Sequence, residues 1–168
     1  MSALSLESSL LSGPHRLLAA MTGTWEGLTQ TYFDPDTVSD ESVWRGTITP
    51  ILDGRFVRHD YTGMLQDKPL SGSAIYGCQL ATGTFQSVWV DSFHNGTSMM
   101  VSQSTPGDAV FNVLGSYDVG EGSPPWGWRT VIEMPDNDTL NIRMYNISPE
   151  GVEYKAVIIN YRRVLNAS

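Results

Sequence analysis

Asp91 is the residue whose type and position most clearly suggest chemistry. In the predicted strand 84–92, alternation places Trp89 and Asp91 on one face, which sets a carboxylate beside an aromatic side chain. Burial of this kind raises the pKa of a carboxyl group unless a cation or amide donors stabilise the ionised form. One hypothesis is that Asp91 is a general base or a hydrogen-bond anchor for a ligand. The alternative is that it caps the turn leading to 94–96 by accepting backbone N–H groups.

Histidines are the second source of acid–base chemistry. In the predicted strand 55–64, His59 shares a face with Tyr61, which makes His59 a candidate catalytic or ligand-binding residue. The alternative is a core imidazole that is hydrogen-bonded to a backbone carbonyl. His94 directly precedes the hairpin-turn signal 95–96, so we predict a turn residue, with ligand contact as the alternative.

The same residue types do not form a metal-binding pattern. His15, His59 and His94 lie too far apart in sequence for a motif such as His-x-x-x-His, and His15 is expected to be solvated. Cys78 is the only cysteine and is expected to be a small buried side chain. We therefore predict neither a metal site nor a cofactor.

Two further residues complete the predicted ligand-binding set of His59, Tyr61, Trp89 and Asp91. Met99 is a flexible apolar side chain suited to an adaptable pocket, and Trp128 follows a proline-rich loop. Their alternatives are structural, because methionines fill irregular gaps in cores and aromatic residues after such a loop often begin a core strand. A mostly apolar, aromatic interior with a few hydrogen-bonding groups is typical of a small-molecule pocket.

Composition bounds the partners of this chain of 168 residues. Ten basic and eighteen acidic residues give a net charge of −8, which repels nucleic-acid phosphates and anionic membrane surfaces. No apolar segment approaches the roughly 18 residues that span a membrane, and no leader-like segment opens the chain. We expect a cytoplasmic protein that binds neither nucleic acid nor membranes.

The elements that must position these residues are a short helix and many strands. Proline and leucine spacing predicts a helix over 14–21, after a loosely ordered arm over 1–12, and a single domain over 13–168. Nine turn signals then separate ten predicted strands, over 24–33, 42–50, 55–64, 70–79, 84–92, 97–104, 109–118, 127–134, 139–147 and 152–164. No connection is long enough for a crossover helix, so the fold class is all-β, an antiparallel up-and-down sheet that curls into a barrel.

Four ordered motifs carry a resemblance to a known family. The chain resembles the bacterial domain-of-unknown-function family DUF1579 over about residues 15–164, through the motifs Met21 to Gly27, Leu52 to Val57, Trp89 to Ser92 and Tyr161 to Arg163. The resemblance implies a ten-stranded, lipocalin-like (calycin) barrel that the N-terminal helix closes at one end, in a family without an established activity.

The calycin resemblance also implies a structural contact. The first-strand Trp25, between the permissive Gly23 and Gly27, would pack under an arginine of the last strand, Arg163 or, with the other parity, Arg162. A guanidinium over an indole contributes about 0.5 to 2 kcal/mol, so this pair is assigned to barrel closure.

Two family sites do not carry over to this sequence. The arginine–x–tyrosine anion site of fatty-acid carriers is reversed here, as Tyr161 and Arg163, and no histidine follows His94 to bind haem iron as in nitrobindins. The leading hypothesis is a module that binds a small hydrophobic or aromatic molecule in its cavity. The alternatives are a cavity-based enzyme (an isomerase, cyclase or acid–base catalyst, as in secondary metabolism) and a structural homodimer with a filled barrel.

Overall fold

The structure is a computed structural model that describes residues 4–165. Two short helices, α1 (Leu6–Ser12) and α2 (Pro14–Ala20), precede the strands. The strands are β1 (Gly23–Thr31), β2 (Asp40–Ile51), β3 (Phe56–Leu65), β4 (Lys68–Gln79), β5 (Thr84–Asp91), β6 (Met100–Gln103), β7 (Phe111–Tyr117), β8 (Trp126–Asp136), β9 (Thr139–Ile147) and β10 (Glu153–Arg163).

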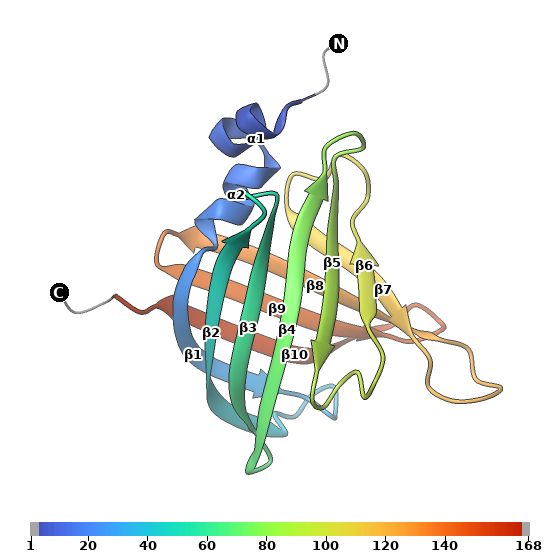
Figure 1. The fold of residues 1–168 in the computed structure, drawn as a ribbon. Helices are drawn as coiled ribbons and strands as arrows, with labels where there is room; N and C mark the ends of the chain where they lie inside the picture. The colour runs from blue at the N-terminus through green and yellow to red at the C-terminus, as the bar shows by residue number, and fades with distance from the viewer. Residues whose placement is uncertain (1–3, 166–168) are drawn as a thin grey trace.

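The strands form one closed antiparallel barrel in which each strand pairs with its neighbours in sequence and β1 pairs with β10 (Figure 1). The predicted all-β, ten-stranded up-and-down barrel is therefore confirmed. The strand bounds shift by a few residues, most at β6, which begins at Met100 because residues 92–99 form turns. Two helices stand where the sequence predicted one.

Helix α1 occupies part of the segment that was expected to be a loosely ordered arm. Ser5 and Ser8 form a reciprocal capping box at its N-terminus, which satisfies backbone N–H groups that the first turn leaves free. Residues 1–3 of the expected arm lie outside the described residues.

His15 is buried rather than solvated, which corrects the expectation for this residue. Its Nδ1 lies 2.9 Å from the hydroxyl of the buried Ser9, and this hydroxyl also accepts the backbone N–H of His15. Burial lowers the pKa of His15. The pair therefore fastens α1 to α2 and leaves no histidine exposed at the helix start.

The helix end of the barrel, where α1 and α2 lie at the top of Figure 1, is closed by Trp25 and Arg163. The guanidinium carbon of Arg163 lies 4.3 Å from the centroid of the Trp25 ring, so the predicted contact is present, with Arg163 as the partner. Trp25 also donates its indole N–H to the carbonyl of Met21 at 2.9 Å. These contacts join α2 to both the first and the last strand.

Side chains fill the barrel from the helix end to its middle. The largest fully buried ones are aromatic and come from strands all around the barrel: Trp25, Trp44, Phe85, Phe111 and Tyr161. Dense packing of this kind occupies the barrel interior at the helix end. We call the opposite end the mouth and define it by the loops 32–39, 66–67, 92–99, 118–125 and 148–152.

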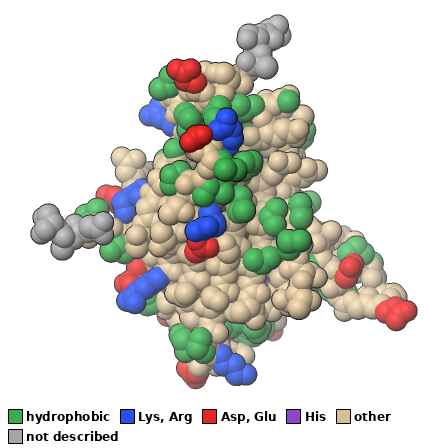
Figure 2. Space-filling view, viewed as in Figure 1, with side chains coloured by type: hydrophobic (Ala, Val, Ile, Leu, Met, Phe, Trp, Pro, Cys, Tyr) green, Lys and Arg blue, Asp and Glu red, His purple; other side chains and the backbone are tan. Residues whose placement is uncertain are grey.

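The outer surface is not uniformly polar. Figure 2 shows apolar side chains gathered over β4 to β6, where Ile75, Val88 and Val101 stand side by side in the strand register and are exposed. Within residues 4–165, no helix has the length and apolarity needed to span a membrane.

Candidate functional site

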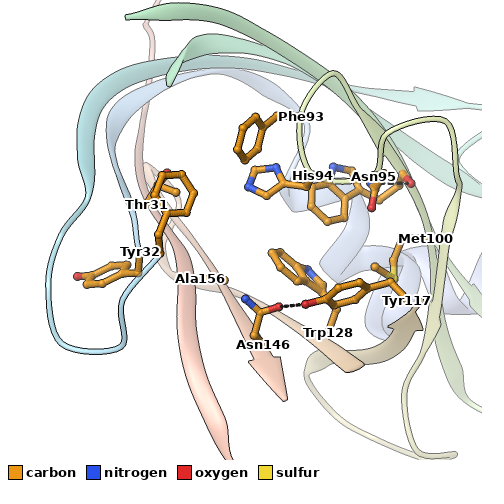
Figure 3. A pocket seen from close by; sticks show the side chains of 12 residues that line it. Thr31, Tyr32, Phe93, His94, Asn95, Met100, Tyr117, Trp128, Asn146 and Ala156 are labelled. Carbon is orange, nitrogen blue, oxygen red and sulfur yellow. Dashed lines mark hydrogen bonds between the residues drawn. The ribbon is translucent and has the colours of Figure 1, made fainter. Parts of the chain in front are cut away.

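A pocket of about 210 Å³ opens at the mouth of the barrel (Figure 3). Its walls come from the mouth ends of β1, β5 to β10 and from the loops 32–39 and 92–99. The lining residues are Thr31, Tyr32, Phe33, Trp89, Phe93, His94, Asn95, Met100, Tyr117, Trp128, Asn146 and Ala156.

Aromatic rings form the deep wall of this pocket. Trp89 and Trp128 lie with ring centroids 5.2 Å apart and planes tilted by 32°, and both are almost fully buried. Tyr117 stands edge-on to Trp128 at 6.2 Å. Because strand alternation turns Trp89 and Trp128 inward, the sequence prediction places both in the pocket, as the structure does. Such rings offer flat apolar surface to a guest molecule.

Asp91 ends β5 and organises the loop that follows it. Its Oδ1 accepts the backbone N–H groups of Phe93 at 3.1 Å and Asn95 at 3.2 Å, and that of His94 between them. The capping role weighed for Asp91 is thus present. The same carboxylate also faces inward, because Oδ2 lies 2.5 Å from Nδ1 of His94 and accepts the Tyr61 hydroxyl at 3.3 Å.

A chain of hydrogen bonds connects the aromatic wall to this carboxylate. Trp89 donates its indole N–H to the Tyr61 hydroxyl oxygen at 2.8 Å, and the Tyr61 O–H donates to Asp91. Burial, together with the nearby Asp91 charge, raises the pKa of Tyr61, which therefore stays protonated. Burial also acts to raise the pKa of Asp91, but the hydrogen bond from His94 and those from the backbone amides outweigh it and hold that pKa below its usual value.

His94 is the site residue that the predicted ligand-binding set did not include. The sequence favoured a turn residue, whereas the loop folds back so that the imidazole lines the pocket and only 12% of the side chain is exposed. The spacing of Asp91 and His94 carried a usable signal. An aspartate that caps a turn brings the residue three positions later back toward its own carboxylate.

Polar groups line the side of the pocket formed by β7 and β9. Tyr117 donates its hydroxyl to Oδ1 of Asn146 at 2.6 Å, as the dashed line in Figure 3 shows. Two buried polar atoms of lining residues, Nε1 of Trp128 and Oγ1 of Thr31, have no hydrogen-bond partner within residues 4–165. Unpaired buried groups are uncommon in folded proteins and cost about 1 to 3 kcal/mol each.

His59 lies in the filled part of the barrel and does not line the mouth pocket. Its Nδ1 is 3.1 Å from the Tyr76 hydroxyl and its Nε2 is 3.4 Å from the Tyr161 hydroxyl. The partners are tyrosines rather than the backbone carbonyl weighed from the sequence. Burial lowers the pKa of His59 to about 4, so the ring is neutral near pH 7.

Met99 stands on the outside of the barrel, with 71% of its surface exposed, and does not line the pocket. Its neighbour Met100 is buried and lines the wall instead. Met99 precedes β6, which begins at Met100, so it lies in the loop and not on the inward face of a strand. Of the six predicted ligand-binding residues, Trp89 and Trp128 line the pocket, and Tyr61 and Asp91 support its wall from behind.

Among the described residues, no group of three or more histidine, cysteine, aspartate or glutamate side chains is arranged to hold a metal ion.

Comparisons with solved structures return distant matches. A designed protein described as a fluorescence-activating β-barrel aligns with 15% identity and a TM-score of 0.39, over 88% of this chain and 96% of that chain. A protein of unknown function from the DUF3598 family of Nostoc punctiforme aligns with 9% identity and a TM-score of 0.26, over 89% of this chain and 98% of that chain. No curated protein sequence matches.

The family comparison covers most of the chain. Residues 11–163 match the family model described as "Protein of unknown function (DUF1579)", which includes both the closing Trp25 and Arg163 and the mouth residues Asp91 and His94. The protein belongs to the DUF1579 family.

Proposed function

We propose that this protein binds a small, largely apolar aromatic molecule in the mouth pocket. The observation that carries the proposal is the contrast between the two halves of the lumen. Aromatic side chains pack the core of the helix half, whereas at the mouth the rings of Trp89 and Trp128 border an open space of about 210 Å³. Pockets that are mostly apolar with a few convergent polar groups are the usual sites of small ligands.

The size of the space limits the ligand. Drug-sized ligands occupy pockets of about 300 to 1,000 Å³, and a volume of 210 Å³ is smaller than this range. A single substituted aromatic ring of about ten non-hydrogen atoms suits it better. At roughly 0.5 kcal/mol per atom, such a ligand binds with about 5 kcal/mol, a dissociation constant below about 1 mM.

Unpaired polar groups support the proposal further. The buried Nε1 of Trp128 and Oγ1 of Thr31 belong to residues that line the same pocket. Because the two atoms are buried in the pocket wall, a ligand with one or two polar substituents supplies the partners that they lack within residues 4–165 only after a small movement of that wall. The site therefore suits a ring with polar substituents better than a pure hydrocarbon.

The test is a titration of nitrogen-15-labelled protein with 4-methoxybenzaldehyde and 4-hydroxybenzaldehyde, followed by NMR of the tryptophan indole N–H groups. We expect the resonances of Trp89 and Trp128 to shift along one saturating curve. The resonance of Trp25 stays in place, because its N–H is bonded to Met21 at the helix end. Absence of saturation with both compounds at several millimolar would refute the proposal.

A matched pair of variants tests the location. Ala156 is buried and lines the pocket, so Ala156→Phe fills the space and should abolish the shifts. Met99→Phe adds a ring on the outside of the barrel and should leave them unchanged. Equal titrations of the two variants would place the binding site elsewhere.

The cavity-based enzyme weighed from the sequence is favoured by one observation, the contact between Asp91 and His94 at the pocket wall. A carboxylate that orients an imidazole is an arrangement that can remove a proton from a bound molecule. Mass spectrometry of the same titration samples separates the two functions. Compounds recovered unchanged support binding, and a new species that disappears in His94→Gln supports an enzyme.

A further inference from the structure

We propose that Nε2 of His94 is a fixed hydrogen-bond acceptor that selects neutral aromatic ligands bearing a hydroxyl group, and that Asp91 is the residue that positions it. This inference rests on the proposed function and adds the class of ligand. Three features support it: the position of the proton on the imidazole, the position of the ring in the pocket, and the polar groups of the opposite wall.

The proton position follows from the partners of Asp91. An ionised carboxylate has acceptors only, and the loop amides and the Tyr61 hydroxyl already donate to it. The Nδ1 atom of His94, 2.5 Å from Oδ2, must therefore carry a hydrogen. In a neutral imidazole the other nitrogen, Nε2, is then left with a lone pair.

The ring is held where this lone pair serves the pocket. His94 packs with its centroid 5.4 Å from that of Trp89 and 5.7 Å from that of Trp128. Figure 3 shows the imidazole directed toward the space in front of Trp128, and no residue of the described chain hydrogen-bonds to its Nε2. A donor on a bound ligand would give this acceptor the partner that it lacks.

The pocket wall opposite His94, which includes Tyr117 and Asn146, determines which second functional group suits the ligand. Oδ1 of Asn146 accepts the Tyr117 hydroxyl, and Figure 3 shows the amide nitrogen of Asn146 turned away from that bond. Its N–H groups suit an acceptor oxygen such as a carbonyl. No lysine or arginine lines the pocket, and the chain carries a net charge of −8, so a carboxylate ligand is disfavoured. A hydroxyaromatic aldehyde or ketone combines these features.

The experiment compares the dissociation constants of 4-hydroxybenzaldehyde and 4-methoxybenzaldehyde, in which a methyl group replaces the hydroxyl hydrogen. Wild-type protein should bind the hydroxyl compound about tenfold more tightly, which is the effect of one well-placed hydrogen bond. The ratio is measured on the unaltered protein, so the result does not depend on whether a variant folds.

Two variants then assign the acceptor. His94→Phe keeps a ring against the tryptophans and should bind the two compounds within about twofold of each other. Asp91→Asn keeps an oxygen for the loop amides but places an N–H opposite Nδ1, which favours the tautomer with the hydrogen on Nε2. Its preference for the hydroxyl compound should fall at least about fivefold.

The outcomes separate the two proposals. Binding of neither compound to the wild-type protein overturns the proposed function and this inference with it. Equal binding of both compounds overturns this inference alone. If Asp91→Asn weakens both compounds by the same factor, so that the ratio is unchanged, the positioning role of Asp91 is wrong. A tenfold preference that persists in His94→Phe shows that another group accepts the hydroxyl and also overturns the inference.

Discussion

Individual residues divide into two polar groups that the sequence did not separate. His59 with its two tyrosines lies inside the packed half of the barrel, and Asp91 with His94 lies at the mouth. Strand alternation turned both His59 and Asp91 inward correctly, but alternation reports only the face of a strand. Depth along the barrel axis depends on register with other strands, which no local pattern encodes.

His59 makes stability depend on pH. Its pKa is about 4 in the folded protein and about 6.5 in an unfolded chain, so between these values the unfolded state binds more protons. The free energy of unfolding therefore falls as the pH drops from about 6.5 to 4, by roughly 3 kcal/mol from this residue. Urea unfolding measured at several pH values between 4 and 6.5 gives the slope of the free energy of unfolding against pH.

His59→Gln is the variant for comparison, because an amide can still bond to the Tyr76 and Tyr161 hydroxyls but does not titrate. Its unfolding free energy should show a shallower slope between pH 4 and 6.5. Asp91, whose pKa is lowered, contributes stability that is lost only below about pH 4 and so does not confuse the result. Identical slopes for the wild type and His59→Gln would contradict the assignment.

At the scale of elements, α2 and the last strand are held together by Arg163. Its guanidinium donates to the carbonyls of Thr22 at 2.6 Å, Ala20 at 3.2 Å and Asn137 at 2.8 Å while covering Trp25. The aromatic contact was foreseeable from the calycin resemblance. The three carbonyl bonds were not, because they depend on where the helix ends relative to the barrel.

Arg163→Met should lower the free energy of unfolding by about 2 to 3 kcal/mol, since it removes charged hydrogen bonds and a cation–π contact from a largely buried side chain. Arg45→Met is the control, because Arg45 pairs with Glu26 at the surface and 74% of its side chain is exposed. The control should cost less than about 1 kcal/mol. Equal losses in chemical denaturation would show that Arg163 is an ordinary surface arginine.

Helix α1 is an element that the sequence did not predict. Its serine-rich composition indicated a loose arm, yet the capping box and the buried bond between Ser9 and His15 stabilise a helix there. The bond forms only once α2 folds back against α1. Tertiary contacts of this kind routinely override weak helix propensity.

At the scale of the whole molecule, the pairing of β1 with β10 closes the barrel. Gly27 sits at this seam opposite Tyr161, and a Cβ added at Gly27 would lie 1.8 Å from the Asn160 carbonyl oxygen. The sequence indicated only that Gly27 is a permissive position, and the structure shows that it allows the close approach of β10. The ten strands and their order were also predictable, because every connection is short.

Gly27→Ala should destabilise the protein by at least about 3 kcal/mol, because the backbone of β10 must move away from β1. Gly77→Ala is the matched control in another strand, where the added Cβ meets only the ring of the partly exposed Phe56. We expect it to cost about 1 kcal/mol or less. Similar thermal unfolding of the two variants would show that the seam tolerates a side chain.

The position of the pocket at one end of the barrel affects the rates at which a ligand enters and leaves it. The proposed ligand would enter and leave at the mouth, past Phe33 and Phe93, whose rings pack together there with centroids 6.0 Å apart. A change confined to this passage alters arrival and departure by one common factor and leaves the equilibrium untouched. A substitution at the rim would therefore change the residence time without changing the affinity, whereas a substitution at the rings beneath it would change both.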